Sequence, residues 1–296
     1  AFIADKLDDA QQPMGFQAQS FFTGLGQTLA NVSLFIFPMI FVGTTGKLPT
    51  WVFASFFLGA VCSIASVWWS SHTTKEIPPS AEELQHMKQE RISIFTPFID
   101  IAKAVVDMPK VMWQLALVYL FQWYALFCYW QNSSKSIALS VWNTTPQQNS
   151  KLYEEAVGWT GLVNGWYNIV TFLTAFALAY FARKYSPKYV HFVCLILAAV
   201  GFLIFPHIEN KYLLFPAITG FGIGWASMMG VPYLMVVTNI PKERYGVYMG
   251  IINMMIVIPM FIQTLSFGYI LKHFLNNDPR SAITFAGVLL MVSAIC

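Results

Sequence analysis

The stretch that decides the fold is residues 111–134, VMWQLALVYLFQWYALFCYWQNSS, which lies between Lys110 and Lys135 and carries no charged side chain. A helix needs about 20 mostly apolar residues to cross the hydrocarbon core of a bilayer, and a charge at its centre is costly. The stretch is therefore long enough to span a membrane as a helix. It lacks the alternation of period two that is typical of strands in a membrane barrel.

Charge-free intervals of this kind recur along the whole chain, and each lies between short segments that carry the charged residues. They predict an all-α, polytopic membrane protein with eight transmembrane helices, of which the last is cut short. None of the predicted spans contains a charged residue. We predict helices at residues 18–42, 50–70, 112–131, 157–181, 189–206, 212–237, 246–271 and 281–296.

The composition excludes most other classes of protein. Of 296 residues, 56% are hydrophobic and only 10% are charged, whereas a soluble domain has about 25% charged residues. Disordered, collagen-like and disulfide-stapled chains are excluded as well, because they are polar, repetitive or rich in cysteine. The net charge of +3 is spread along the chain, so no nucleic-acid partner is expected. Because the chain begins without methionine and stops inside an apolar run, we expect a fragment of a longer protein.

Lys and Arg are unevenly divided between the two sides of the predicted spans. One side holds eleven of them and the other holds six. Since cytoplasmic loops carry the excess of basic residues, the first side is predicted to be cytoplasmic. Two N-x-[ST] sequons, at Asn132 and Asn143, then fall in the longest predicted external loop. The predicted cytoplasmic segments are 1–17, 71–111, 182–188 and 238–245.

A long cytoplasmic connection, residues 71–111, divides the chain. We expect residues 1–70 to be the remnant of an N-terminal six-helix bundle, its helices five and six, and residues 112–296 to be a C-terminal six-helix bundle. A short internal echo between residues 14–18 and 245–249 favours two related halves. The second half of the linker has apolar residues at helical spacing, which predicts an amphipathic helix on the membrane face, with a solvated connector as the alternative. These residues are Phe95, Phe98, Ile99, Ala102, Val105 and Val106.

Several runs resemble the major facilitator superfamily, and more narrowly its sugar and cation symporter branch, which includes sucrose transporters and bacterial glycoside carriers. The resemblance covers nearly the whole chain, from the loop before helix five to a truncated helix twelve. The loop at residues 181–188 departs from the family pattern, because the Asp and the glycines of its gating motif are missing. The runs that carry the resemblance are Ile3-Ala4-Asp5, Gly15 with residues 19–26, Asp107-Met108-Pro109, residues 114–116 and 121–127, residues 224–227, Pro232-Tyr233, residues 246–253 and residues 256–259.

The resemblance implies a partial major facilitator fold, with eight of twelve transmembrane helices. It also implies two six-helix bundles that rock and expose a central sugar site alternately to each side. Transport in this branch is usually coupled to a proton or another cation. Because the predicted spans carry no charge, we expect the coupling acids to lie in helices one to four, outside this sequence.

Candidate substrate-binding residues gather on the predicted helix at 112–131. A sugar site needs neutral hydrogen-bonding side chains beside flat aromatic rings, in a mostly apolar cavity. At about 100° per residue, Tyr119, Trp123 and Trp130 share one face, with Gln122 beside them. The alternative is an interfacial belt of aromatic residues, which applies most to Trp130, near the predicted helix end.

Amides inside other predicted spans are further candidates. Asn164 and Asn168 share a face of the helix at 157–181, and Asn253 lies on the helix at 246–271. Amides in hydrocarbon are expensive unless they are paired or face water. They therefore either bind substrate or join neighbouring helices by hydrogen bonds.

The helix at 212–237 combines packing and binding signals. Gly220 and Gly224 form a GxxxG pattern, which predicts close approach of another helix. Trp225 and Tyr233 advance along one side and are candidates to contact the substrate.

Four residues are candidates for gating. Pro232 and Pro259 are predicted kink points within their helices. Lys242 and Arg244 form a cytoplasmic turn that is expected to pair with Asp5 in one state. The alternative for this turn is a role in topology alone.

The sequence does not favour an enzyme. Its five histidines form no H-E-x-x-H, and no G-x-S-x-G is present. We predict no catalytic residues, no metal site and no cofactor. The expected partners are a sugar, a coupling cation such as a proton, and the lipid bilayer of the plasma membrane or bacterial inner membrane. The alternatives are a transporter of another polar cargo and a receptor or scaffold with the same fold.

Overall fold

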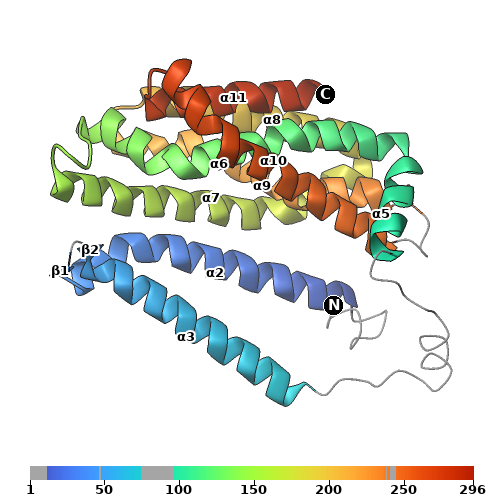
Figure 1. The fold of residues 1–296 in the computed structure, drawn as a ribbon, viewed down its shortest axis with the longest axis horizontal. Helices are drawn as coiled ribbons and strands as arrows, with labels where there is room; N and C mark the ends of the chain where they lie inside the picture. Colours follow the sequence, from blue (N-terminus) through green and yellow to red (C-terminus); the bar gives the residue numbers. More distant parts are fainter. Residues whose placement is uncertain (1–11, 47, 75–95, 238, 241–244) are drawn as a thin grey trace. The chain divides into compact units, whose positions relative to one another are not determined.

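The fold is helical throughout, apart from one short hairpin (Figure 1). The computed structural model describes residues 12–46, 48–74, 96–237, 239–240 and 245–296. The predicted all-α class is confirmed. The elements are α2 (Gln12–Ile40), β1 (Thr44–Thr45), β2 (Leu48–Pro49), α3 (Thr50–Thr73), α5 (Thr96–Val106), α6 (Lys110–Trp142), α7 (Ser150–Lys184), α8 (Pro187–Ile204), η1 (Phe205–His207), η2 (Lys211–Leu213), α9 (Leu214–Val237), α10 (Tyr245–His273) and α11 (Pro279–Ile295).

The residues form two compact units, 1–36 with 109–296 and 37–108. The second unit contains the antiparallel pair β1–β2, helix α3 and helix α5. Gly43 and Gly46 have φ angles of 101° and 69°, a conformation that favours glycine on either side of β1. Within its own unit, helix α3 has no buried residue among those described. Helix α5 lies in the stretch for which an amphipathic helix is predicted.

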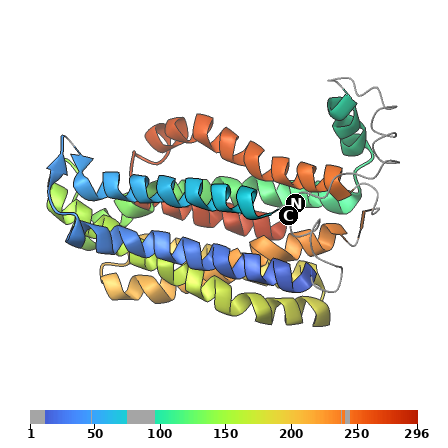
Figure 2. The same ribbon diagram turned by 90° about the horizontal axis from the view of Figure 1, so that it is seen from below.

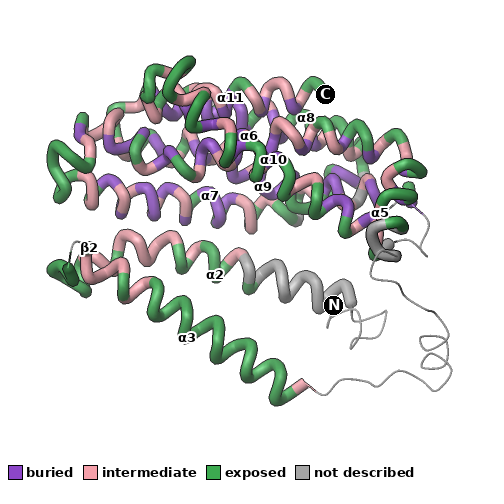
Figure 3. The backbone as a smooth tube through the Cα atoms, viewed as in Figure 1, coloured by how far each residue is buried: buried purple, intermediate pink, exposed green. Residues whose placement is uncertain are grey.

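The first unit is built around α6 and α9. Helix α6 packs against α7, α10 and α11, α9 packs against α7 and α8, and α11 also packs against α8. Figures 1 and 2 show α6 to α9 and α11 running along a common direction, and in Figure 1 α10 runs obliquely across them. The buried residues lie on the faces that these helices turn toward one another (Figure 3).

Glycines bring α9 close to both of its neighbours. A side chain at Gly224 would meet Ala198 on α8 at 2.7 Å, and one at Gly220 would overlap the Leu197 carbonyl. The close approach predicted from the GxxxG pattern is thus confirmed, with α8 as the partner. On the opposite side of α9, Gly222 lies against the Tyr167 carbonyl on α7. Such contacts let backbones approach where larger side chains would hold helices apart.

Helix α6 is longer than predicted. It was expected to end near residue 131, but it continues to Trp142, where Asn143 adopts a left-handed conformation with φ of 47°. The charged Lys135 is tolerated because its side chain is exposed on the helix surface. The prediction that Asn132 lies in an external loop is wrong, because this residue is buried on α6 and donates to the Cys128 carbonyl at 2.9 Å.

Five helices among the described residues are long and apolar enough to cross a membrane. Two shorter apolar helices, at residues 24–40 and in α11, add to them. Helix α7 is more polar, and its threonines bond to the backbone of their own helix, as Thr160 does to Ala156 at 2.7 Å. Such bonds satisfy polar groups inside hydrocarbon. The five helices are Thr50–Thr73, Lys110–Trp142, Pro187–His207, Lys211–Tyr233 and Gly246–His273.

Candidate substrate site

One face of α6 carries polar atoms that are buried without a hydrogen-bond partner. Gln122 is fully buried, and neither its amide nitrogen nor its amide oxygen is paired within the described structure. The Tyr119 hydroxyl and the Trp123 indole nitrogen, on the same face, are also unpaired. Buried polar groups are nearly always paired, so a concentration of exceptions marks a place where a polar partner fits.

Aromatic rings from α6 and α9 meet beside these polar atoms. The indoles of Trp123, Trp130 and Trp225, here called the indole cluster, lie in mutual contact. Their ring centroids are 5.8 Å apart for Trp123 and Trp225, 5.6 Å for Trp130 and Trp225, and 6.4 Å for Trp123 and Trp130. Tyr119 extends the cluster along α6, with its ring 6.2 Å from that of Trp123. The structure thus brings together Tyr119, Trp123 and Trp225, which the sequence predicts from two separate helices.

Helix α7 adds amides to the edge of the indole cluster. The Tyr129 hydroxyl donates to the Asn164 side-chain oxygen at 2.8 Å, which joins α6 to α7. Asn168 is buried and donates to the Asn164 carbonyl at 2.8 Å. Because Tyr129 is the neighbour of Trp130 in the chain, Asn164 lies near the cluster and joins α6 to α7, whereas the bond of Asn168 lies within α7.

The other predicted residues are placed less uniformly. Tyr233 on α9 is partly buried, with its phenol near that of Tyr119. Asn253 on α10 is exposed, and the described contacts do not bring it into the cluster.

The structure describes two of the four predicted gating residues. Pro232 and Pro259 are buried inside α9 and α10, which continue through them. The predicted cytoplasmic turn at Lys242 and Arg244 lies outside the described residues.

Sequence reasoning missed a polar link between α6 and α10. Gln263 on α10 is fully buried, and its amide nitrogen donates to Gln131 at 3.1 Å, while its amide oxygen has no partner among the described residues. The Tyr124 hydroxyl lies 2.8 Å from the Ser266 hydroxyl on the same pair of helices. Gln263 could have been found from the same signal as Asn253, because both are amides within a charge-free run.

The chemistry of this region is neutral. The indole cluster and the polar atoms beside it offer amide, phenol and indole groups and flat ring faces, and none of these side chains carries a formal charge. No group of three metal-ligating side chains occurs among the described residues. Such a surface suits a neutral solute that presents hydroxyl groups and weakly apolar faces.

Comparison with known families identifies the class of protein. The family model described as Major Facilitator Superfamily matches residues 15–264. The chain belongs to this superfamily and is a multi-pass membrane transporter. A comparison with curated proteins finds no match.

Proposed function

We propose that this transporter moves a sugar, a disaccharide or related glycoside, by alternating access, and that the indole cluster and Gln122 contact it. Residues 112–296 would serve as one six-helix half, residues 1–70 as part of the other and residues 71–111 as the cytoplasmic linker. The natural membrane would be the plasma membrane or a bacterial inner membrane.

The observation that carries the proposal is the buried, unpaired amide of Gln122. An amide offers both a donor and an acceptor, as does each hydroxyl group of a sugar. Leaving such a group unpaired in an apolar interior costs about 1–3 kcal/mol. An unpaired amide at this buried position is therefore explained if it forms hydrogen bonds with a bound polar solute. Trp123, the next residue along α6, supplies a flat ring and contacts the ring of Trp225.

Coupling to a proton or another cation is the second part of the proposal. The residues of the indole cluster are neutral, so the cluster itself offers no carboxylate for a coupling ion. Intramembrane acids are the default carriers of such coupling. The proposal therefore places the coupling acids apart from the indole cluster.

Uptake of labelled sucrose and maltose by the full-length protein in proteoliposomes tests both parts together. Accumulation against a concentration gradient, driven by an inward proton gradient, is the expected result. Uptake without accumulation would support sugar transport but contradict coupling to a cation. If neither sugar enters under a proton or a sodium gradient, the sugar proposal fails.

A second candidate function is a receptor or scaffold that retains the transporter fold. The observation that favours it is the packing of Trp123, which is only 5% exposed and lies against Trp225 and Tyr119. Single cysteines at positions 122 and 123 distinguish the two functions. Reaction with a small water-soluble thiol reagent supports an aqueous path for a solute, and complete protection in every condition supports the receptor or scaffold.

A further inference from the structure

Helix α10 contacts a face of α6 that adjoins the face of the indole cluster. Tyr124, Cys128 and Gln131 recur at intervals of four and three residues, so they share one face of α6. This face meets α10, which crosses α6 obliquely (Figure 1). Tyr124 and Gln131 directly follow Trp123 and Trp130 in the chain, and successive residues of a helix lie about 100° apart. The contacts with α10 and those of the indole cluster are therefore made by adjoining faces of one helix.

The contact at Tyr124 is a hydrogen bond between two hydroxyl groups. The Tyr124 hydroxyl lies 2.8 Å from the Ser266 hydroxyl on α10. The Ser266 hydroxyl also donates to the Ile262 carbonyl of its own helix at 2.6 Å. Since a serine hydroxyl has one hydrogen, Ser266 accepts from Tyr124. Ser266→Ala would therefore leave the Tyr124 hydroxyl without this acceptor.

Aromatic contacts hold the Tyr124 ring independently of its hydroxyl group. The ring centroid is 6.4 Å from that of Phe267 on α10 and 6.4 Å from that of Phe285 on α11, edge to face in both cases. Tyr124→Phe keeps a ring for these contacts and removes only the hydroxyl group. Loss of the hydrogen bond can therefore be separated from loss of packing.

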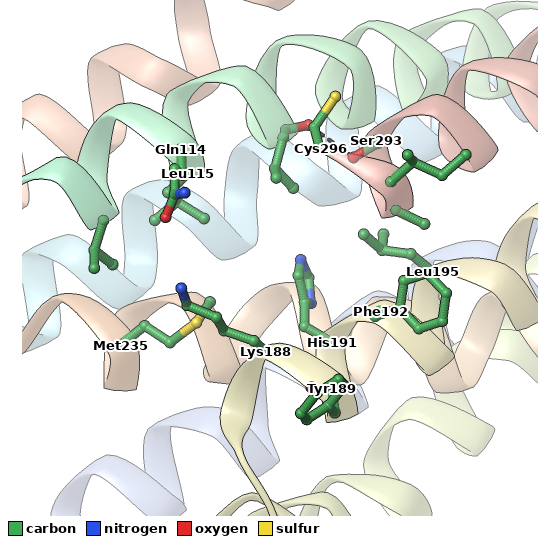
Figure 4. A pocket seen from close by; sticks show the side chains of 14 residues that line it. Gln114, Leu115, Lys188, Tyr189, His191, Phe192, Leu195, Met235, Ser293 and Cys296 are labelled. Atoms are coloured by element: carbon green, nitrogen blue, oxygen red, sulfur yellow. Dashed lines mark hydrogen bonds between the residues drawn. The ribbon is translucent and has the colours of Figure 1, made fainter.

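Two further hydrogen bonds hold α6 in the bundle. The Gln263 amide nitrogen on α10 donates to Gln131 at 3.1 Å. The Ser293 hydroxyl on α11 donates to the Val118 carbonyl of α6 at 2.8 Å. Figure 4 shows Ser293 at the wall of a cavity between α6, α8 and α11. With both bonds intact, loss of the Tyr124 bond should let α6 turn slightly about its axis without unfolding the bundle.

We propose that Ser266 is a positioning residue for the sugar, which acts through Tyr124 to fix the rotation of α6 and so the place of Trp123 in the indole cluster. This inference rests on the proposed sugar site. A helix turns as one body, so a turn that moves Tyr124 on one face also moves Trp123 on the adjoining face. Groups that bind a ligand must be held to within about 0.5 Å, and supporting hydrogen bonds provide that precision.

Equilibrium binding of labelled sucrose or maltose to the purified full-length protein tests the effect on the sugar. We expect Tyr124→Phe and Ser266→Ala each to bind about fivefold more weakly, the factor that corresponds to one hydrogen bond of about 1 kcal/mol. The double variant should be no weaker than either one, because both changes remove the same bond. Ser266→Thr keeps a hydroxyl group and should restore binding. Thr264→Ala is the matched control, since this exposed residue bonds to the Met260 carbonyl of its own helix at 2.9 Å.

Fluorine NMR of the protein labelled with fluorotryptophan gives a measurement that does not depend on the sugar. The resonance of Trp123 is the one that is lost in Trp123→Phe. We expect Tyr124→Phe and Ser266→Ala to shift it, and Thr264→Ala and Ser266→Thr to leave it in place. A merely structural bond would lower thermal stability in the first two variants without moving this resonance.

The two measurements separate this inference from the proposed function. An unshifted Trp123 resonance in Tyr124→Phe and Ser266→Ala would overturn the positioning role, as would wild-type sugar affinity in both variants. If the wild type binds neither sugar while the resonance shifts as expected, the sugar proposal fails and the control of Trp123 by Ser266 is supported.

Discussion

The indole of Trp123 on α6 meets the indole of Trp225 on α9 edge to face, with ring centroids 5.8 Å apart and an interplanar angle of 77°. This contact joins two helices that the described packing otherwise connects mainly through their neighbours. It also leaves the Trp123 indole nitrogen buried and unpaired. The pair therefore stabilises the bundle and, at the same point, presents a hydrogen-bond donor that has no acceptor.

Trp123→Ala in the full-length protein should raise the apparent KM for sugar about tenfold, since an aromatic contact contributes about 1 kcal/mol beyond its buried area and the indole donor is lost as well. Membrane insertion should be unchanged. The measurement is initial uptake rate against sugar concentration in proteoliposomes. Trp113→Ala, at an exposed position on α6, is the control. Wild-type kinetics in Trp123→Ala would remove this residue from the site.

Gln122→Leu should lower transport and raise stability. The substitution removes two unpaired polar atoms from a buried position at little change in volume, which relieves a cost of about 1–3 kcal/mol. Thermal unfolding in detergent and uptake measure the two effects separately. Gln263→Leu is the contrasting variant and should lower stability, because the amide nitrogen of Gln263 donates to Gln131 at 3.1 Å and this bond between α10 and α6 would be lost. A lower melting temperature for Gln122→Leu would indicate that this amide is paired in the native protein.

Gly220→Ala should destabilise the bundle by about 1–3 kcal/mol, because the added methyl group overlaps the Leu197 carbonyl and must push α8 away from α9. Gly230→Ala, on the same helix, has open space around the added carbon and should be neutral or slightly stabilising. Thermal unfolding of both variants in detergent measures the difference. Equal stability of the two would contradict the close packing of α8 on α9.

Asp278 caps the N-terminus of α11, and its carboxyl group predicts how stability depends on pH. Its carboxylate accepts from the Arg280 backbone at 2.8 Å and pairs with the Arg280 guanidinium at 3.0 Å. Partial burial raises the pKa of this carboxyl, but the hydrogen bonds and charge of Arg280 outweigh burial and hold the pKa below its usual range. A lowered folded pKa means that the cap stabilises the protein above the unfolded pKa of about 3.9 and loses this effect as the pH falls through the folded pKa.

Asp278→Ala should therefore cost about 1 kcal/mol at pH 7, as is usual for a helix cap. The difference from the wild type should shrink as the pH falls below about 4. Unfolding of both proteins across pH 3–7 measures it. A difference that is constant over this range would show that the Asp278 charge does not contribute.

The charge-free intervals predicted the helices well, because hydrocarbon admits few charges whatever the tertiary structure is. The end of α6 was predicted wrongly for the same reason: Lys135 marked the limit of the interval, although an exposed lysine can continue a helix. The same error favoured an interfacial belt as the alternative for Trp130, although helical periodicity also places it on the face of Tyr119 and Trp123. Helix α6 continues to Trp142, and Trp130 lies inside the indole cluster.

The candidate site was predictable in part. Helical periodicity placed Tyr119, Trp123 and Trp130 on one face with Gln122 beside them, and the structure shows that this face meets Trp225 from α9. Periodicity within one helix does not say which neighbour that face meets. The contacts of Asn164 with Tyr129, and of Gln263 with Gln131, depend on how α7 and α10 pack against α6, which a single sequence does not reveal.

The most direct test of the central claim is equilibrium binding of a labelled disaccharide to the purified full-length protein, compared between wild type, Gln122→Leu and Trp113→Ala. We predict saturable binding to the wild type and to Trp113→Ala, and binding at least about tenfold weaker in Gln122→Leu, because the lost hydrogen bonds are worth more than about 1.4 kcal/mol. Equal binding by all three proteins would contradict the proposal that the buried face of α6 contacts the sugar.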